Sequence, residues 1–187
     1  MGAGITEVFA RNGLEVVAVE RDEAALPSGI QHVETSTSRA VKRGKLSEEE
    51  SSAVRARVSA TANLHDLADC DLVIESVVED LAVKTELFLR LDGIVRPDAI
   101  LATNTSYLDP DAIAAATSRP ERVLGLHFFS PANVMRLLEV VRCGRTAPDV
   151  LATGLAVAKR LRKLPIVCGV TEGFISNRIF SAYRREA

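Results

Sequence analysis

Apolar and polar positions follow two different periods along this chain. Short apolar runs rich in β-branched residues predict strands over 14–19, 58–63, 71–77, 100–103, 122–129, 135–141 and 164–170. Helical spacing or helix-start signals predict helices at 5–13, within 21–57, and at 81–95, 148–161 and 173–187. Strands that alternate with helices in this way are typical of an α/β protein with a doubly wound, mostly parallel sheet.

Polar residues follow two of the predicted strands at the point where each strand ends. Asn104, Thr105 and Ser106 come after the strand over 100–103, while His127 and Ser130 lie at the end of the strand over 122–129. In an open parallel sheet, ligands bind in the crevice beyond the carboxyl ends of the strands. These residues therefore predict a site at that edge of the sheet.

One acid, Glu139, interrupts the apolar run from Met135 to Val141. A strand buried on both faces does not tolerate an unpaired charge, so Glu139 needs a partner, and His127 is the candidate. A carboxylate fixes the tautomer of a histidine and stabilises its imidazolium, as a general base near neutral pH requires. The alternative is a core histidine with a structural partner.

The first elements indicate a nucleotide ligand. A helix, a turn at Gly13 and a strand that ends on Glu20 are the later parts of a dinucleotide-binding βαβ unit, whose first strand and leading glycines are missing here. An acid at the end of the second strand accepts hydrogen bonds from ribose hydroxyls and disfavours a 2′-phosphate, which selects NAD over NADP. Alternatively, Glu20 is a solvated acid at a strand end.

Composition narrows the class of protein. The 187 residues fit one domain and part of a second, and 47% hydrophobic residues are enough for a core. A formal net charge of -2 gives no reason to expect nucleic acid or an anionic membrane as a partner. No apolar run is long enough to cross a bilayer, and no leader suggests secretion. Three scattered cysteines without metal-like spacing suit the cytoplasm, and we expect no metal.

Five segments of the chain form a recognisable set: MGAGI, DLVIESVVED, ATNTS, HFFSPANVMRLLEVV and GFISNR. Together they resemble the NAD-binding domain of the 3-hydroxyacyl-CoA dehydrogenases of fatty acid β-oxidation, and the similarity covers essentially the whole chain. The segment HFFSPANVM and the terminal sequence YRREA are most similar to the dehydrogenase part of the multifunctional enzymes that also carry an enoyl-CoA hydratase. The resemblance implies an NAD-dependent oxidoreductase with a Rossmann-like fold that acts on acyl-CoA substrates.

The resemblance also implies roles for individual residues. His127 matches the base that takes the proton from the substrate 3-hydroxyl, and Glu139 matches the acid that pairs with it. Ser106 matches the serine at the substrate hydroxyl and the nicotinamide, and Asn177 the asparagine at the substrate carbonyl. Ser36 is a loose match to a serine that contacts CoA. The residues expected to bind the cofactor are Gly2, Glu20, Glu79, Lys84, Asn104, Ser106 and Ser130.

The resemblance divides the chain into residues 1–170, an NAD-binding domain without its first strand, and residues 171–187, the start of a helical second domain. In the family that second domain forms a homodimer and closes over the acyl chain. Gly2 aligns with the third glycine of the phosphate-binding loop, and the first two are absent. We therefore expect a truncated product or an excised fragment that binds NAD weakly, with unpaired edges on the strands beside the missing one.

Two other functions remain open. One is a related β-hydroxyacid dehydrogenase with a non-CoA substrate. A basic patch formed by Arg39, Lys42, Arg43 and Lys45 argues against this function, because it could bind CoA phosphates. The same residues equally suit a solvated helix face. The other is an inactive fragment of a dehydrogenase that only associates with other subunits.

Overall fold

The computed structural model describes residues 1–186, which form two compact units. The first unit contains Met1–Leu67 together with Ser130–Met135, and the second contains Ala68–Phe129 and the chain from Arg136 onward. The architecture is α/β and Rossmann-like, as the alternating pattern predicts. The two units do not correspond to the predicted domains 1–170 and 171–187, and the predicted boundary between residues 170 and 171 stays a prediction.

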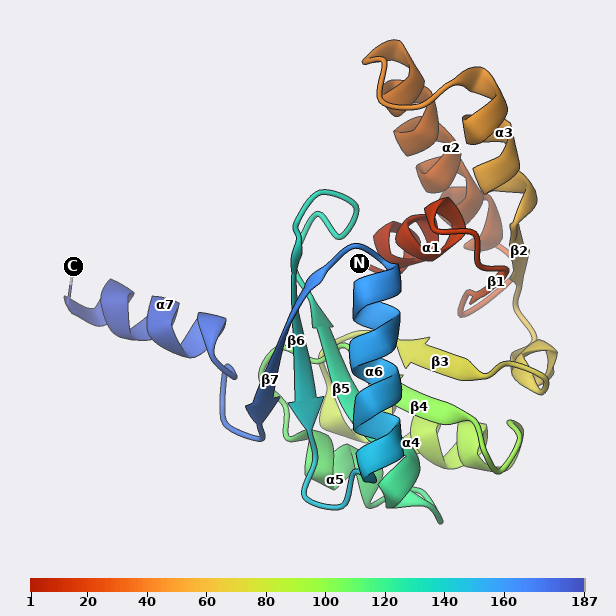
Figure 1. The fold of residues 1–187 in the computed structure, drawn as a ribbon. Coiled ribbons are helices and arrows are strands. Elements are labelled where there is room, and N and C mark those ends of the chain that lie inside the picture. Colours follow the sequence, from red (N-terminus) through yellow and green to blue (C-terminus); the bar gives the residue numbers. More distant parts are fainter. Residues whose placement is uncertain (187) are drawn as a thin grey trace. The chain divides into compact units, whose positions relative to one another are not determined.

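The first unit is a two-stranded parallel sheet covered by helices (Figure 1). Its elements are α1 (Gly2–Arg11), β1 (Val16–Val19), α2 (Leu26–Lys42), α3 (Glu48–Ala56), β2 (Val58–Thr61) and the 3-10 turn η1 (Leu64–Leu67). The apolar residues Ile5, Val8, Val33 and Val54 form its buried centre. The predicted helix and strands of this region are confirmed.

Two local signals in the first unit act as the sequence predicts. Gly13 follows α1 with φ of 78°, a left-handed conformation that glycine adopts without steric cost. Ser47 begins α3 with a capping box, in which its side chain accepts from the Glu50 amide while the Glu50 carboxylate accepts from the Ser47 amide. These residues fix where α1 ends and where α3 begins.

The second unit is built on a five-stranded sheet in the order β3-β4-β5-β6-β7. Its strands are β3 (Leu72–Glu75), β4 (Ile100–Thr103), β5 (Val123–Phe128), β6 (Leu137–Arg142) and β7 (Leu164–Gly169). Its helices are α4 (Leu81–Asp92), α5 (Pro110–Ala114), α6 (Pro148–Arg160) and α7 (Ser176–Glu186), with a 3-10 turn η2 (Pro120–Arg122). All pairs of strands are parallel except β5 and β6.

The single antiparallel strand decides which helices cover which face of this sheet. Connections between parallel strands are right-handed, so α4 and α5, which join β3, β4 and β5, share one face. Because β6 and β7 run in the opposite direction, the same rule places α6 on the other face, where it contacts β5, β6 and β7 (Figure 1). Every residue of β4 and β5 is consequently buried.

Both sheets end in strands with a free edge. Within residues 1–186, β1 pairs only with β2, and β3 pairs only with β4. The unpaired strand edges that the sequence predicts are therefore present among these residues. Such an edge exposes backbone N–H and C=O groups that could pair with a further strand.

The last helix, α7, has no buried residue and carries the exposed side chains Ile179, Phe180 and Tyr183. The helix predicted over 173–187 is confirmed from Ser176, while Ala187 lies outside the described residues. Among residues 1–186, no helix combines the length and the apolar character needed to cross a bilayer.

Candidate active site

His127 and Glu139 face each other across two antiparallel strands. They are direct partners in the register of β5 and β6, and side chains at such positions lie on the same face of the sheet. His127 Nδ1 lies 2.7 Å from Glu139 Oε2, and the two residues are 4% and 0% exposed. The partnership predicted from a lone acid in an apolar strand is confirmed.

The second carboxylate oxygen of Glu139 is also occupied. Glu139 Oε1 accepts hydrogen bonds from the backbone amides of Ile175 at 3.2 Å and Ser176 at 2.8 Å. These amides lie where α7 begins, and a helix N-terminus favours a negative charge. Glu139 therefore holds its carboxylate in a fixed position behind the imidazole.

Ser106 meets the opposite side of the imidazole ring. Its Oγ lies 3.2 Å from His127 Nε2. Because an ionised carboxylate only accepts hydrogen bonds, Nδ1 must donate to Glu139, which leaves Nε2 of the neutral ring as an acceptor for the Ser106 hydroxyl. An imidazole whose unprotonated nitrogen faces a hydroxyl is arranged to receive a proton from an alcohol.

The ends of β4 and β5 are joined at this site. The Asn104 side-chain oxygen accepts from the Phe128 amide at 2.8 Å, so the start of the turn that carries Ser106 is tied to the strand that carries His127. The rings of Phe129 and Phe174 lie 4.6 Å and 5.5 Å from the imidazole centroid. These aromatic neighbours give the site apolar walls.

Two other predicted residues of the second unit, Glu79 and Lys84, are joined by an ion pair of 3.3 Å near Ser106. Glu79 accepts from the Ser106 amide, and Lys84 is almost fully buried. Asn177 is the second residue of α7 and is half-buried, but no hydrogen bond joins it to the other candidate residues within the described chain. Its role at the substrate carbonyl stays a prediction.

The remaining candidates, Gly2, Glu20, Ser36 and Ser130, lie in the first unit. Ser36 Oγ accepts from the Asn133 side chain at 3.0 Å, and Ser130 is exposed. Gly2 opens α1, which has no side-chain cap.

Glu20 follows β1, and its side-chain carboxylate has no hydrogen bond or ion pair with any described residue. A Cβ on Gly29 would lie 2.7 Å from Glu20 Oε1, so glycine allows the helix to approach the carboxylate. A free carboxylate at a strand end and an uncapped helix N-terminus fit the ribose and phosphate groups of NAD.

Several partners of the site were not predicted from the sequence. The Ile175 and Ser176 amides on Glu139 carry no side-chain signal that could have revealed them. Glu75 did carry one, because it is an acid at the end of the apolar run DLVIE and is buried like Glu139. Its carboxylate binds Lys84 Nζ at 2.6 Å and Thr103 Oγ1 at 2.8 Å.

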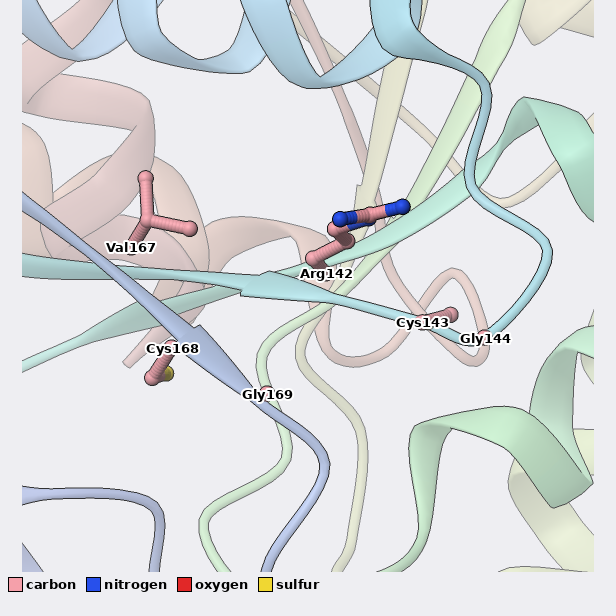
Figure 2. A pocket seen from close by; sticks show the side chains of 6 residues that line it. All are labelled: Arg142, Cys143, Gly144, Val167, Cys168 and Gly169. Carbon is pink, nitrogen blue, oxygen red and sulfur yellow. The ribbon is translucent and has the colours of Figure 1, made fainter.

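A surface pocket of about 400 Å³ lies at the opposite end of β6, beside the end of β7 (Figure 2). Arg142, Cys143 and Cys168 are among its lining residues. Burial raises the pKa of Cys143 to about 12, and burial together with the Glu139 charge raises that of Cys168 to about 11. Both thiols therefore stay protonated at neutral pH and are poor nucleophiles. No group of three or more potential ligands within residues 1–186 could hold a metal ion.

The fold and the braced histidine define a dehydrogenase-like nucleotide-binding protein, and comparison with known proteins gives the family. Residues 1–171 match the family model described as the NAD binding domain of 3-hydroxyacyl-CoA dehydrogenase. The chain belongs to this family.

Similar proteins are longer than this chain. The peroxisomal bifunctional enzyme of Danio rerio is 42% identical over 100% of the chain and 25% of the relative, and a probable 3-hydroxybutyryl-CoA dehydrogenase of Deinococcus radiodurans is 38% identical over 100% and 67%. The crystal structure of 3-hydroxybutyryl-CoA dehydrogenase from Escherichia coli K12 matches with a TM-score of 0.97 and 41% identity, over 100% of this chain and 39% of that one. The chain thus spans between a quarter and two thirds of these relatives.

Proposed function

We propose that this chain provides the NAD-binding and proton-accepting part of a 3-hydroxyacyl-CoA dehydrogenase, which oxidises the 3-hydroxyl of 3-hydroxyacyl-CoA to a 3-oxo group in fatty acid β-oxidation. The observation that carries the proposal is the continuous contact from Ser106 through His127 to Glu139, with distances of 3.2 Å and 2.7 Å. Membership in the family supports the choice of cofactor and substrate.

The mechanism assigns proton transfer to the chain's own residues. A substrate hydroxyl held near Ser106 Oγ gives its proton to His127 Nε2, and Glu139 stabilises the imidazolium that forms. When bound, NAD supplies the nicotinamide ring that accepts the hydride from the substrate carbon. The rings of Phe129 and Phe174 restrict water around the imidazole, which strengthens its interaction with Glu139.

The location and assembly of the protein are part of the same proposal. We place it in the cytoplasm, because Cys70, Cys143 and Cys168 are all free, although relatives include peroxisomal enzymes. We also propose that this chain takes part in a homodimer, which the exposed Ile179, Phe180 and Tyr183 on α7 support. Sedimentation of the chain with and without charged substitutions at Phe180 and Tyr183 tests the dimer.

An absorbance assay of NADH with acetoacetyl-CoA, which follows the reaction in reverse, tests the activity. We expect wild-type chain to consume NADH and His127→Gln to be slower by about 100-fold or more, because a positioned acid–base group contributes about 10²–10⁴-fold. A Glu86→Ala variant, which changes an exposed acid on α4, is the control and should keep the wild-type rate. Equal rates for wild type and His127→Gln would overturn the role of His127.

A second candidate function is an associating fragment without activity of its own. It is favoured by the free edges of β1 and β3 and by the apolar residues exposed on α7. The same assay separates the two functions. No NADH consumption by wild type or variant, with a folded chain shown by circular dichroism, would support the associating fragment.

A further inference from the structure

The turn that presents Ser106 to His127 is held by one carboxylate. Glu79 Oε1 accepts three hydrogen bonds from consecutive residues of this turn: from Thr105 Oγ1 at 2.5 Å, the Ser106 amide at 2.7 Å and the Tyr107 amide at 3.1 Å. Three donors from adjacent residues on one oxygen fix the backbone on both sides of Ser106 Cα. The direction of the Ser106 hydroxyl therefore depends on Glu79.

Glu79 is itself held from the protein interior. Its second oxygen, Oε2, lies 3.3 Å from Lys84 Nζ, and the same ammonium lies 2.6 Å from Glu75 Oε1. The side chains of Lys84 and Glu75 are 1% and 0% exposed. Glu75 is fixed in turn by the Thr103 hydroxyl and the Val77 amide. Lys84 is therefore held in one position by Glu75 at the end of β3, and it gives Glu79 a rigid anchor.

The charge of Glu79 suits this task. Burial alone would raise the pKa of its carboxyl group, but the hydrogen bonds from Thr105, Ser106 and Tyr107 and the charge of Lys84 together lower it. An ionised carboxylate carries no proton and only accepts hydrogen bonds, so both of its oxygens are open to donors. Hydrogen bonds to a charged acceptor are also about twice as strong as neutral ones.

We propose that Glu79 is a positioning residue for the proton transfer, which it serves by holding the turn over 104–107 so that Ser106 Oγ faces His127 Nε2. The inference rests on the proposed function and adds a role in orienting a catalytic serine to the role at the cofactor pocket that the sequence predicts for Glu79. Both of its oxygens are engaged by this chain, Oε1 by the turn and Oε2 by Lys84. Lys84 and Glu75 are its anchor.

Nitrogen-15 NMR of the His127 ring in the complete chain tests the inference without substrate or cofactor. Ser106→Ala removes the hydroxyl from Nε2 and defines the Nε2 chemical shift of the uncoupled ring. We expect Glu79→Ala to move the Nε2 resonance most of the way to that position, while the Nδ1 proton bound to Glu139 keeps its resonance. Persistence of the Nδ1 proton signal shows that the His127–Glu139 pair is intact.

Two further variants make the result decisive. Glu79→Gln keeps the shape and one accepting oxygen but loses the charge, so we expect a smaller displacement in the same direction. Glu86→Ala removes an exposed acid from α4, the helix that follows Glu79, and should leave Nε2 at its wild-type position. If Nε2 stays at the Glu86→Ala position in both Glu79→Gln and Glu79→Ala, the inference is wrong. Should Glu79→Ala fail to fold, the position of Nε2 in Glu79→Gln decides alone.

The outcome is independent of the proposed activity. A displaced Nε2 resonance in a chain that never consumes NADH would support the role of Glu79 in orienting Ser106 and contradict the proposed function. An active chain whose Nε2 resonance is unchanged by the Glu79 substitutions would support the proposed function and contradict the role of Glu79.

Discussion

The second unit contains two buried carboxylates at strands, and their partners differ. Glu139 on β6 is 0% exposed and binds His127, whereas Glu75 on β3 is 3% exposed and binds Lys84. Each carboxylate is also satisfied by backbone amides or a hydroxyl, so neither is left with an unpaired charge. In both regions, a buried acid is stabilised by one side-chain partner and by further hydrogen-bond donors.

The partner determines what each pair can do. A neutral imidazole has one nitrogen that accepts a proton, so the Glu139 pair can take up and release a proton while the carboxylate remains in place. The Lys84 ammonium lies between two carboxylates and only donates hydrogen bonds, so the Glu75 pair serves as an anchor. One pair is thus suited to reaction, and the other to holding the turn that completes the reactive site.

The largest effect is expected from breaking the anchor. Glu75→Leu leaves the Lys84 ammonium buried without its closest partner, and removing one member of a buried ion pair costs about 3–5 kcal/mol. Urea unfolding of the variant measures this loss in the free energy of unfolding. The double variant Glu75→Leu/Lys84→Met should recover most of it. A double variant as unstable as the single one would contradict the account.

A smaller loss is expected when the reactive pair is broken in the same way. Glu139→Leu leaves His127 and two backbone amides without their acceptor, but the histidine can stay neutral, so no buried charge is stranded. We expect a loss of about 1–3 kcal/mol, which is the cost of unsatisfied buried groups. A loss larger than that of Glu75→Leu in parallel urea titrations would show that the two pairs do not differ as proposed.

Hydroxyl groups beside the two pairs offer a milder comparison. Thr103→Val removes a buried donor to Glu75, so we expect the free energy of unfolding to fall by about 1–2 kcal/mol. Ser106→Ala removes a half-buried donor from His127 Nε2 and should change stability by less than about 0.5 kcal/mol. Thermal melts of both variants provide the measurement. Equal losses would indicate that the Ser106 contact contributes as much to stability as the Thr103 contact.

The smallest effect concerns pH. The pKa of Glu79 is lowered in the folded chain from the ordinary value of 4.5, so its contribution to stability is present above that value and is lost as pH falls through the lower, folded pKa. Glu79→Gln removes this contribution and should make the acid side of the stability profile shallower. Because the side chain is 39% exposed, solvent screens the effect. A profile unchanged by Glu79→Gln below pH 4.5 would contradict the lowered pKa.

The sequence predicts the reactive pair better than the anchor, for a physical reason. An acid in the middle of the apolar run around Glu139 has to be paired, and a histidine at the end of a neighbouring strand was the available partner. Glu75 stands at the end of its strand, where an acid also suits solvent. Its partner Lys84 lies on the next helix, at a separation that follows neither the strand nor the helix period.

Other features escaped prediction because no short-range pattern records them. The helix α5 has five residues, too few to show a helical repeat. Asn133 donates to Ser36 and to Glu7 across separations of 97 and 126 residues. The strands, the longer helices and the cap at Ser47 were predictable because each depends on residues close together in the chain.

The protonation of the His127 ring tests the central claim most directly. Nitrogen-15 NMR at a pH where the ring is neutral should show the proton on Nδ1, donated to Glu139, with Nε2 unprotonated and facing Ser106. In that form Nε2 can accept the proton of an alcohol. A neutral ring with its proton on Nε2 would contradict the account, because the nitrogen that meets the substrate would then have no free electron pair to receive a proton.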